Sequence, residues 1–165
     1  MKRGTRNNNP GNIRISPAKW KGKVPVDLNT DGAFEQFVSM PYGIRALYRL
    51  LITYINKYGL KSVDAIIDRY APAGDNSEAA RNNYKNFVRQ QINGKNQIES
   101  IFDFLALADG IMIFENSQAD FDEHIMPHLM EAKKISGLDD LNLANEKKNW
   151  LHQPAGQPLY LHYSI

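Results

Sequence analysis

Residues 41–59 read PYGIRALYRLLITYINKYG, and this stretch decides the fold class. Its apolar residues recur every three or four positions from Ile44 to Tyr58, and Gly59 closes the run. This spacing places them on one face of an α-helix, and glycine is common just after a helix end. We therefore predict a long amphipathic helix, which must bury its apolar face against other elements of the chain.

More helical segments follow this one. Ser62 can cap a helix that ends before the breaker at 71–74, and residues 75–78 offer a capping box for another that ends near Asn93-Gly94. The next segment is apolar almost throughout and runs from Ile98 to Phe114-Glu115-Asn116. We also expect helices near 120–135 and 139–150, followed by an irregular tail.

The residues before position 41 show a different pattern. A short strand is predicted at 12–15, and the next run alternates with Val24, Val26 and Leu28 on one face. The turn signal Asn29-Thr30-Asp31-Gly32 follows, and residues 33–38 would return as the partner strand. The expected fold class is therefore mainly α with a small β-hairpin, an α+β arrangement around one core.

Composition limits the class of protein. The 165 residues suit one domain, and the 42% apolar and 23% charged contents are those of a globular chain. The absence of cysteine excludes disulfides, thiolate metal sites and a cysteine nucleophile. The sequence shows neither a membrane span nor a signal peptide, so we expect a protein made in the cytoplasm.

Charge is unevenly distributed along the chain. Residues 1–23 hold seven Lys or Arg and no acid, whereas residues 97–140 hold ten acids and two Lys. A basic arm is compatible with binding a nucleic acid or another anionic polymer. Only Trp20 interrupts the arm with an aromatic side chain, so a solvated arm that pairs with the acidic segment is favoured and nucleic acid is not expected as a partner.

The common nucleotide-binding and hydrolase motifs are absent. His124 and His128 are four residues apart and would share a helix face, but Pro127 lies between them and no third ligand is evident. We therefore predict no metal site and no cofactor.

Glu115 is the most informative carboxylate. It ends the most apolar helix of the chain, where desolvation and the helix C-terminus both disfavour a negative charge. A carboxylic acid that stays protonated near neutral pH can donate a proton to the leaving oxygen of a glycosidic bond. The alternative is a solvated Glu at a frayed helix end.

Several stretches resemble a family of phage proteins that opens with R-G-x-R-N-N-N-P-G-N-I-R. Here this block spans residues 3–14, and similarity continues at Trp20-x-Gly22, Thr30-Asp31, Phe34-x-x-Phe37 and residues 42–47. It extends through residues 66–72 and 75–77, where Asp75 stands in place of a usual Glu, to residues 114–117, which resemble an H-E-N-G element without its His and Gly. The resemblance implies a virion-associated protein and covers roughly residues 3–117.

A looser similarity links the same blocks to flagellar-type glucosaminidases of the lysozyme superfamily. Those enzymes place a helix ending in a catalytic Glu before the N-N-x-x-G-I-K, W-x-G and hairpin elements, whereas the helix ending at Glu115 comes after them here. The resemblance therefore implies a circularly permuted lysozyme-like core at 1–117, with residues 118–165 as a helical extension and tail on the same domain.

That resemblance implies a peptidoglycan-cleaving glycosidase: a muramidase, a glucosaminidase or a lytic transglycosylase. Glu115 would be the general acid, with Asp31 as first and Glu35 as second choice for another carboxylate; Asp27 is a further option, and substrate-assisted catalysis would need none. The expected substrate-binding residues are Asn8, Asn9, Asn12, Trp20, Thr30 and Tyr42. Each has an alternative structural role in a turn or the core.

Two other functions remain open. The chain could be a non-catalytic virion structural or cell-wall-binding protein, or a nucleic-acid binder that uses residues 1–23. The expected partners are peptidoglycan strands and other virion proteins, and the protein would act at the cell wall or be carried in a virion.

Overall fold

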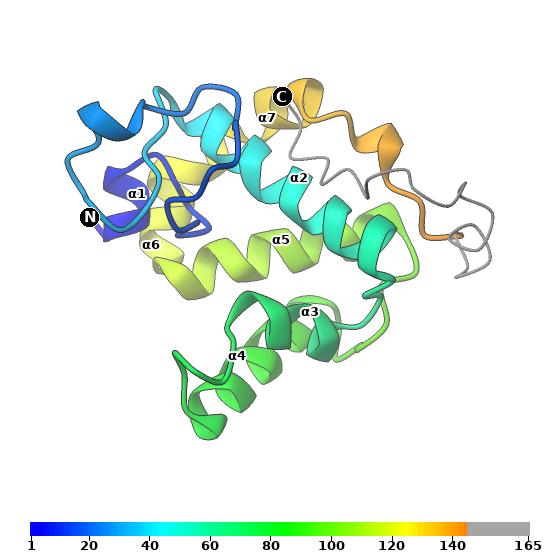
Figure 1. Cartoon of the computed structure of the whole chain (residues 1–165). Coiled ribbons are helices and arrows are strands. Elements are labelled where there is room, and N and C mark those ends of the chain that lie inside the picture. The colour runs from blue at the N-terminus through cyan, green and yellow to red at the C-terminus, as the bar shows by residue number, and fades with distance from the viewer. Residues whose placement is uncertain (145–165) are drawn as a thin grey trace, which may run out of the picture.

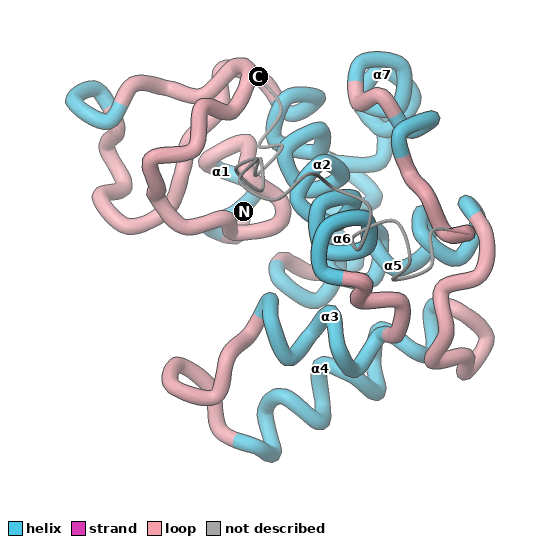
Figure 2. The backbone as a smooth tube through the Cα atoms, turned by 45° about the vertical axis from the view of Figure 1, so that its right-hand side comes forward, coloured by secondary structure: helices cyan, strands magenta, loops and turns pink. Residues whose placement is uncertain are grey.

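The computed structural model describes residues 1–144, which form a helical domain (Figures 1 and 2). Its α-helices are α1 (Arg3–Arg6), α2 (Met40–Tyr58), α3 (Val63–Tyr70), α4 (Glu78–Gln91), α5 (Ile101–Glu115), α6 (Gln118–Asp120) and α7 (Leu129–Ile135). Three 3₁₀ turns, η1 (Val26–Leu28), η3 (Met126–His128) and η4 (Leu138–Asp140), and one π turn, η2 (Phe121–Ile125), complete them. The predicted helices before residue 118 are confirmed, although Ser77 rather than Asp75 caps α4 and α5 begins at Ile101 rather than Ile98.

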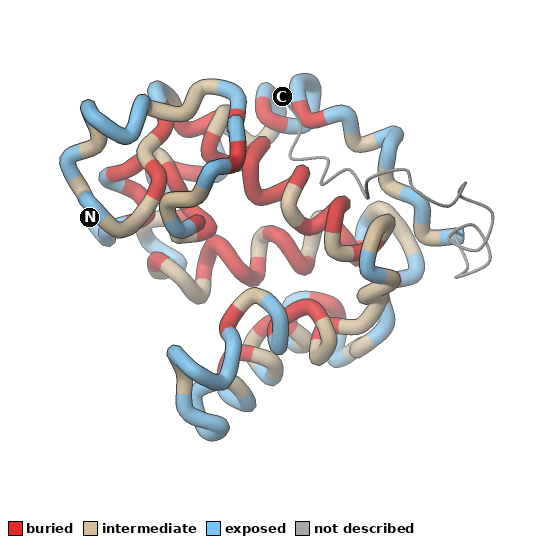
Figure 3. The backbone as a smooth tube through the Cα atoms, in the orientation of Figure 1, coloured by how far each residue is buried: buried red, intermediate tan, exposed pale blue. Residues whose placement is uncertain are grey.

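Helix α5 is the central element of the core. It carries apolar side chains on all sides, as a helix does when other elements surround it. Phe104, Leu107 and Ile111 are completely buried, and α2, α4 and α6 all pack against this helix. Buried positions are correspondingly concentrated on α5 and on the facing side of α2 (Figure 3).

The segment after α5 packs back onto α2. Residues 118–135 form an almost continuous helical path through α6, η2, η3 and α7, close to the predicted range of 120–135. Arg45 donates to the Ile135 carbonyl at 3.0 Å, and Arg49 donates to the Ser136 and Gly137 carbonyls and pairs with Asp140. The two arginines of α2 therefore fix the end of α7. Most of the helix predicted at 139–150, and the predicted tail, lie outside the described residues.

The predicted β-hairpin is wrong, and the fold is mainly α. Residues 1–144 contain no β-strand, only isolated bridges, two of which join Arg14 to Phe34 and Lys23 to Phe37. Pro25 and the turn η1 interrupt the run at 24–28, because proline cannot donate to a ladder. Val26 and Leu28 are 58% and 65% exposed, so the alternating face covers no core.

One part of the turn prediction does hold. The Asn29 side chain accepts from the backbone N–H groups of Asp31 at 2.8 Å and Gly32 at 2.9 Å. This is the side-chain mimic of a turn that Asn commonly provides. The chain therefore reverses at 29–32, although no ladder extends from the reversal.

The N-terminal segment is fastened to the end of α5 by Asn116. This buried side chain accepts from the Thr5 backbone N–H at 3.0 Å and donates to the carbonyls of Pro10 and Met112 at 2.9 Å. Gly4 permits the approach, because a Cβ there would lie 2.6 Å from the Asn116 side-chain oxygen. Residues more than a hundred positions apart thus meet at one end of α5 (Figure 1).

No helix within residues 1–144 has both the length and the hydropathy needed to cross a bilayer.

Candidate functional site

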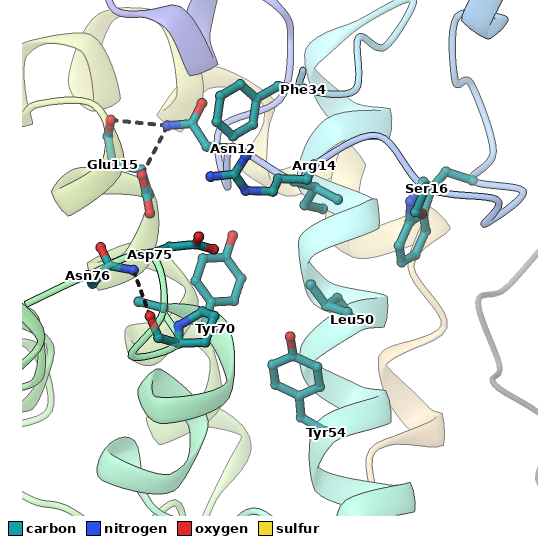
Figure 4. Close-up of a pocket in the computed structure, with 14 residues that line it drawn as sticks. Asn12, Arg14, Ser16, Phe34, Leu50, Tyr54, Tyr70, Asp75, Asn76 and Glu115 are labelled. Atoms are coloured by element: carbon teal, nitrogen blue, oxygen red, sulfur yellow. Dashed lines mark hydrogen bonds between the residues drawn. The ribbon is translucent and has the colours of Figure 1, made fainter. Parts of the chain in front are cut away.

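A pocket of about 390 Å³ opens between the N-terminal loop, α2, the end of α3 and the end of α5 (Figure 4). This volume lies within the range of small-ligand sites, and polar and aromatic side chains supply most of the lining. The lining residues are Asn12, Ile13, Arg14, Ser16, Trp20, Phe34, Leu50, Tyr54, Tyr70, Ala71, Pro72, Asp75, Asn76 and Glu115.

Glu115 lies at the meeting point of the N-terminal loop and the helices. Asn12 donates from Nδ2 to Glu115 Oε2 at 3.0 Å, and Tyr84 donates from its hydroxyl to Oε1 at 3.1 Å. Burial raises the pKa of the Glu115 carboxyl above its ordinary value, while the two hydrogen bonds lower it by a smaller amount. Both donors are neutral, and among the described residues no cation hydrogen-bonds to this acid to offset its desolvation.

Two tyrosines surround the acid. Tyr84 projects from α4 and stacks on Phe114 with 3.9 Å between ring centroids, and Tyr70 at the end of α3 donates to the Gly11 carbonyl. Burial raises the pKa of both hydroxyls well above the ordinary value, and the nearby Glu115 acts in the same direction. The two hydroxyls therefore remain neutral donors at any physiological pH.

Backbone geometry brings Asn12 to this position. Asn12 has a left-handed φ of 49°, which asparagine tolerates better than most residues. Gly11 precedes it, where a Cβ would lie 2.6 Å from the Tyr70 hydroxyl. The Pro-Gly-Asn turn is therefore shaped so that the Asn12 amide reaches the carboxyl while the backbone touches Tyr70.

Three of the predicted site residues line the pocket: Glu115, Asn12 and Trp20. Trp20 is only 5% exposed and packs with Ile13 and Phe37 in a small second core. It therefore contributes an edge to the pocket wall rather than an open stacking platform.

The predicted second carboxylates lie elsewhere. Asp31 makes a bidentate ion pair with Arg3 at 2.7 Å and accepts from Asn7, and these contacts hold its pKa well below the usual range. Glu35 is completely buried and pairs with Lys23 at 2.8 Å; burial nevertheless raises the pKa of its carboxyl. Neither residue lines the pocket, and Asp27, in η1, does not line it either.

The remaining predicted binding residues hold the N-terminal loop together. Asn9 is completely buried and donates to the Ile13 and Glu35 carbonyls at 2.9 Å. Asn8 donates to the Phe37 carbonyl at 3.1 Å, and Thr30 donates to the Gln36 side chain. Tyr42 lies against Gly22, where a Cβ would come within 2.4 Å of its ring. None of these four lines the pocket around Glu115.

Other pocket residues were not predicted as site residues, although some lie in stretches that the family resemblance covers. They include Arg14, Tyr70 and the pair Asp75-Asn76; Tyr84, which does not line the pocket but donates to Glu115, was not predicted either. The tyrosines occupy apolar helix positions, which indicate only core, and Asp75-Asn76 has the form of a helix cap. The clearest sequence signal for a binding residue was Arg14, the basic residue that ends the Asn-rich block.

Among the described residues, no three His, Asp or Glu side chains gather in a way that could hold a metal ion. His124 and His128 lie on η2 and η3, beside a different surface hollow that also includes Arg6 and Glu123.

Comparison with known proteins identifies a phage relative. Residues of this chain are 47% identical over 89 positions to Protein P5 of Pseudoalteromonas phage PM2, an alignment that covers 52% of each protein. The chain therefore matches about half the length of that relative. No protein-family model matches the chain. The sequence is thus similar to a phage protein over half its length.

Proposed function

We propose that this protein is a peptidoglycan-cleaving glycosidase of phage or prophage origin, with Glu115 as its general acid. The observation that carries the proposal is the position of Glu115, a desolvated carboxyl held by two neutral donors at the wall of a pocket. A raised pKa keeps such a group protonated closer to neutral pH, which is the state that must donate a proton to a glycosidic oxygen.

The surroundings of Glu115 suit a polar glycan. Arg14 lines the pocket as an exposed cation and lies over Phe34 at 5.2 Å, and Asn12 and Asn76 add amide groups. These groups can hydrogen-bond sugar hydroxyls and N-acetyl substituents. The guanidinium can also attract the carboxylates that peptidoglycan carries and that a neutral glycan such as chitin lacks.

The phage relative supports the proposed setting. A glycosidase from a phage would act on the host cell wall, either in solution or as part of a virion with other virion proteins as partners. The lysozyme-like, permuted arrangement belongs to the same proposal. The meeting of the Asn-rich loop with the helix ending at Glu115 supports it.

A second candidate is a non-catalytic virion or cell-wall-binding protein. It is favoured by one observation, namely that Asp31 and Glu35 are bound in ion pairs away from the pocket. Neither Asp31 nor Glu35 therefore joins Glu115 in the pair of carboxylates expected for hydrolysis.

Digestion of purified sacculi distinguishes the two candidates. Wild-type protein should release soluble muropeptides that mass spectrometry detects, and Glu115→Gln should release none above background. The matched control is Glu99→Gln, which changes an exposed acid outside the pocket. Binding of sacculi by wild-type protein without any release would contradict the proposal and favour the second candidate.

A further inference from the structure

Asp75 is the other carboxylate of the Glu115 pocket. Of the fourteen lining residues, Glu115 and Asp75 are the only acids. Asp75 belongs to the loop between α3 and α4, so the two acids reach the pocket from different elements (Figure 4). The residues named from sequence as a second carboxylate, Asp31, Glu35 and Asp27, do not line this pocket.

The environments of the two acids are opposite. Glu115 is largely withdrawn from water, whereas Asp75 is exposed and remains hydrated. Within residues 1–144 no hydrogen bond or ion pair engages the Asp75 carboxylate. Its loop is nevertheless held, because the Asp75 backbone N–H and the Asn76 side chain both donate to the Pro72 carbonyl, at 3.1 and 3.3 Å.

We propose that Asp75 is the second catalytic carboxylate and acts as the general base for an attacking water. This inference rests on the proposed function and deepens it, since it assigns the chain to hydrolysis rather than lytic transglycosylation. A desolvated acid and a hydrated carboxylate that line the same pocket have the two environments that inverting glycosidases give their acid and base. The hydrated position of Asp75 also provides the water that such a reaction consumes.

The reaction balances with these two groups and one water. Glu115 donates its proton to the glycosidic oxygen as the bond from that oxygen to the anomeric carbon breaks. Water forms the new bond to the anomeric carbon from the opposite face, and Asp75 accepts the proton that this water loses. Asp75 then releases its proton to solvent and Glu115 regains one, so both groups return to their starting states.

Kinetics on solubilised glycan strands test the assignment. Asp75→Asn should lower kcat by about a hundredfold or more, the usual contribution of a general base, with little change in KM. The matched control is Glu78→Gln, which removes an exposed acid three residues away that does not line the pocket. It should retain wild-type kcat. Asp75→Glu, which keeps the carboxylate, should recover part of the lost rate.

The products provide an independent readout. Wild-type protein should produce ordinary reducing ends, with the anomeric configuration inverted immediately after cleavage. Anhydro-sugar ends, retained configuration, or an Asp75→Asn variant as fast as wild type would each overturn the role of Asp75. If Glu115→Gln abolishes cleavage while Asp75→Asn does not, only this inference fails; if wild-type protein cleaves nothing, the proposed function fails with it.

Discussion

Asp31 and Glu115 have opposite electrostatic environments, although both carboxylates accept hydrogen bonds from asparagines of the N-terminal loop. Asp31 accepts from the Arg3 guanidinium, from Asn7 and from two backbone N–H groups, which favour its charged form. Within residues 1–144 the Glu115 carboxyl accepts only from Asn12 and Tyr84, and it is desolvated. A cation partner makes a carboxylate a structural anchor, whereas neutral donors and burial leave it able to hold a proton.

The largest expected difference between the two residues is in catalysis. Glu115→Gln should lower kcat on peptidoglycan by about 10²- to 10⁴-fold, because the proton donor is lost. Asp31→Asn should change kcat by less than about threefold when measured well below its melting temperature. Steady-state release of reducing ends measures both. Equal losses in the two variants would show that Glu115 has no special role.

Replacing Asp31 should lower the free energy of unfolding more than replacing Glu115 does. Asp31→Ala should lower the free energy of unfolding by about 1–3 kcal/mol, because the backbone N–H groups of Ala33 and Phe34 lose their acceptor. Chemical denaturation measures this loss, and Asp27→Ala, an exposed acid in the neighbouring turn η1, is the matched control. An Asp31→Ala variant as stable as the control would remove the anchor role.

The two carboxylates should also affect stability with opposite pH trends. The folded-state pKa of Glu115 is raised, so its ionisation opposes folding, and this penalty disappears below the ordinary pKa of 4.5. Glu115→Gln should therefore be more stable than wild type at pH 7, with an advantage that vanishes as the pH falls to about 4.

Asp31 has a lowered folded-state pKa, so its stabilising effect is complete above the ordinary value of 3.8 and is lost only in stronger acid. The deficit of Asp31→Asn should persist from pH 7 down to about 4 and shrink below that. Denaturation of the three proteins across this range checks both trends. Parallel curves for the two variants would contradict the contrast.

The smallest expected effect concerns the hydroxyl of Tyr84. Tyr84→Phe keeps the ring that stacks on Phe114 but removes the donor that stabilises ionised Glu115. The pKa of Glu115 should rise further, so the alkaline limb of the pH–activity profile should move to higher pH, with kcat at the optimum reduced less than about tenfold. Tyr58→Phe, on the exposed end of α2, should leave the profile unchanged.

The helices were predictable because their signals are local. Each apolar repeat between Ile44 and Tyr58 joins residues three or four positions apart, and α2 forms over this stretch. The cap at Ser62 acts within one turn, and its side chain accepts from the Ala65 N–H at the start of α3. The predicted hairpin does not form, because an alternating apolar face stabilises a strand only when a core covers it. The segment at 24–28 lies on the surface, where Pro25 and η1 replace ladder bonds.

The site was only partly predictable, for a related reason. Glu115 was recognisable from the apolar helix that it ends, and its pairing with the Asn-rich segment followed from the resemblance. The sequence places Asp31 at a turn, but the contact that decides its role is with Arg3, 28 positions away. Asp75 has the local form of a helix cap, and only the tertiary structure places it in the pocket.

The most direct test of the central claim is a carbon-13 NMR titration of the side-chain carboxyl carbons in the intact protein. Glu115→Gln and Asp31→Asn spectra would assign the two resonances. The account predicts that Glu115 titrates above the ordinary value of 4.5 and that Asp31 titrates below 3.8. A Glu115 resonance that titrates at or below 4.5 would show an ordinary ionised carboxylate and would contradict the account.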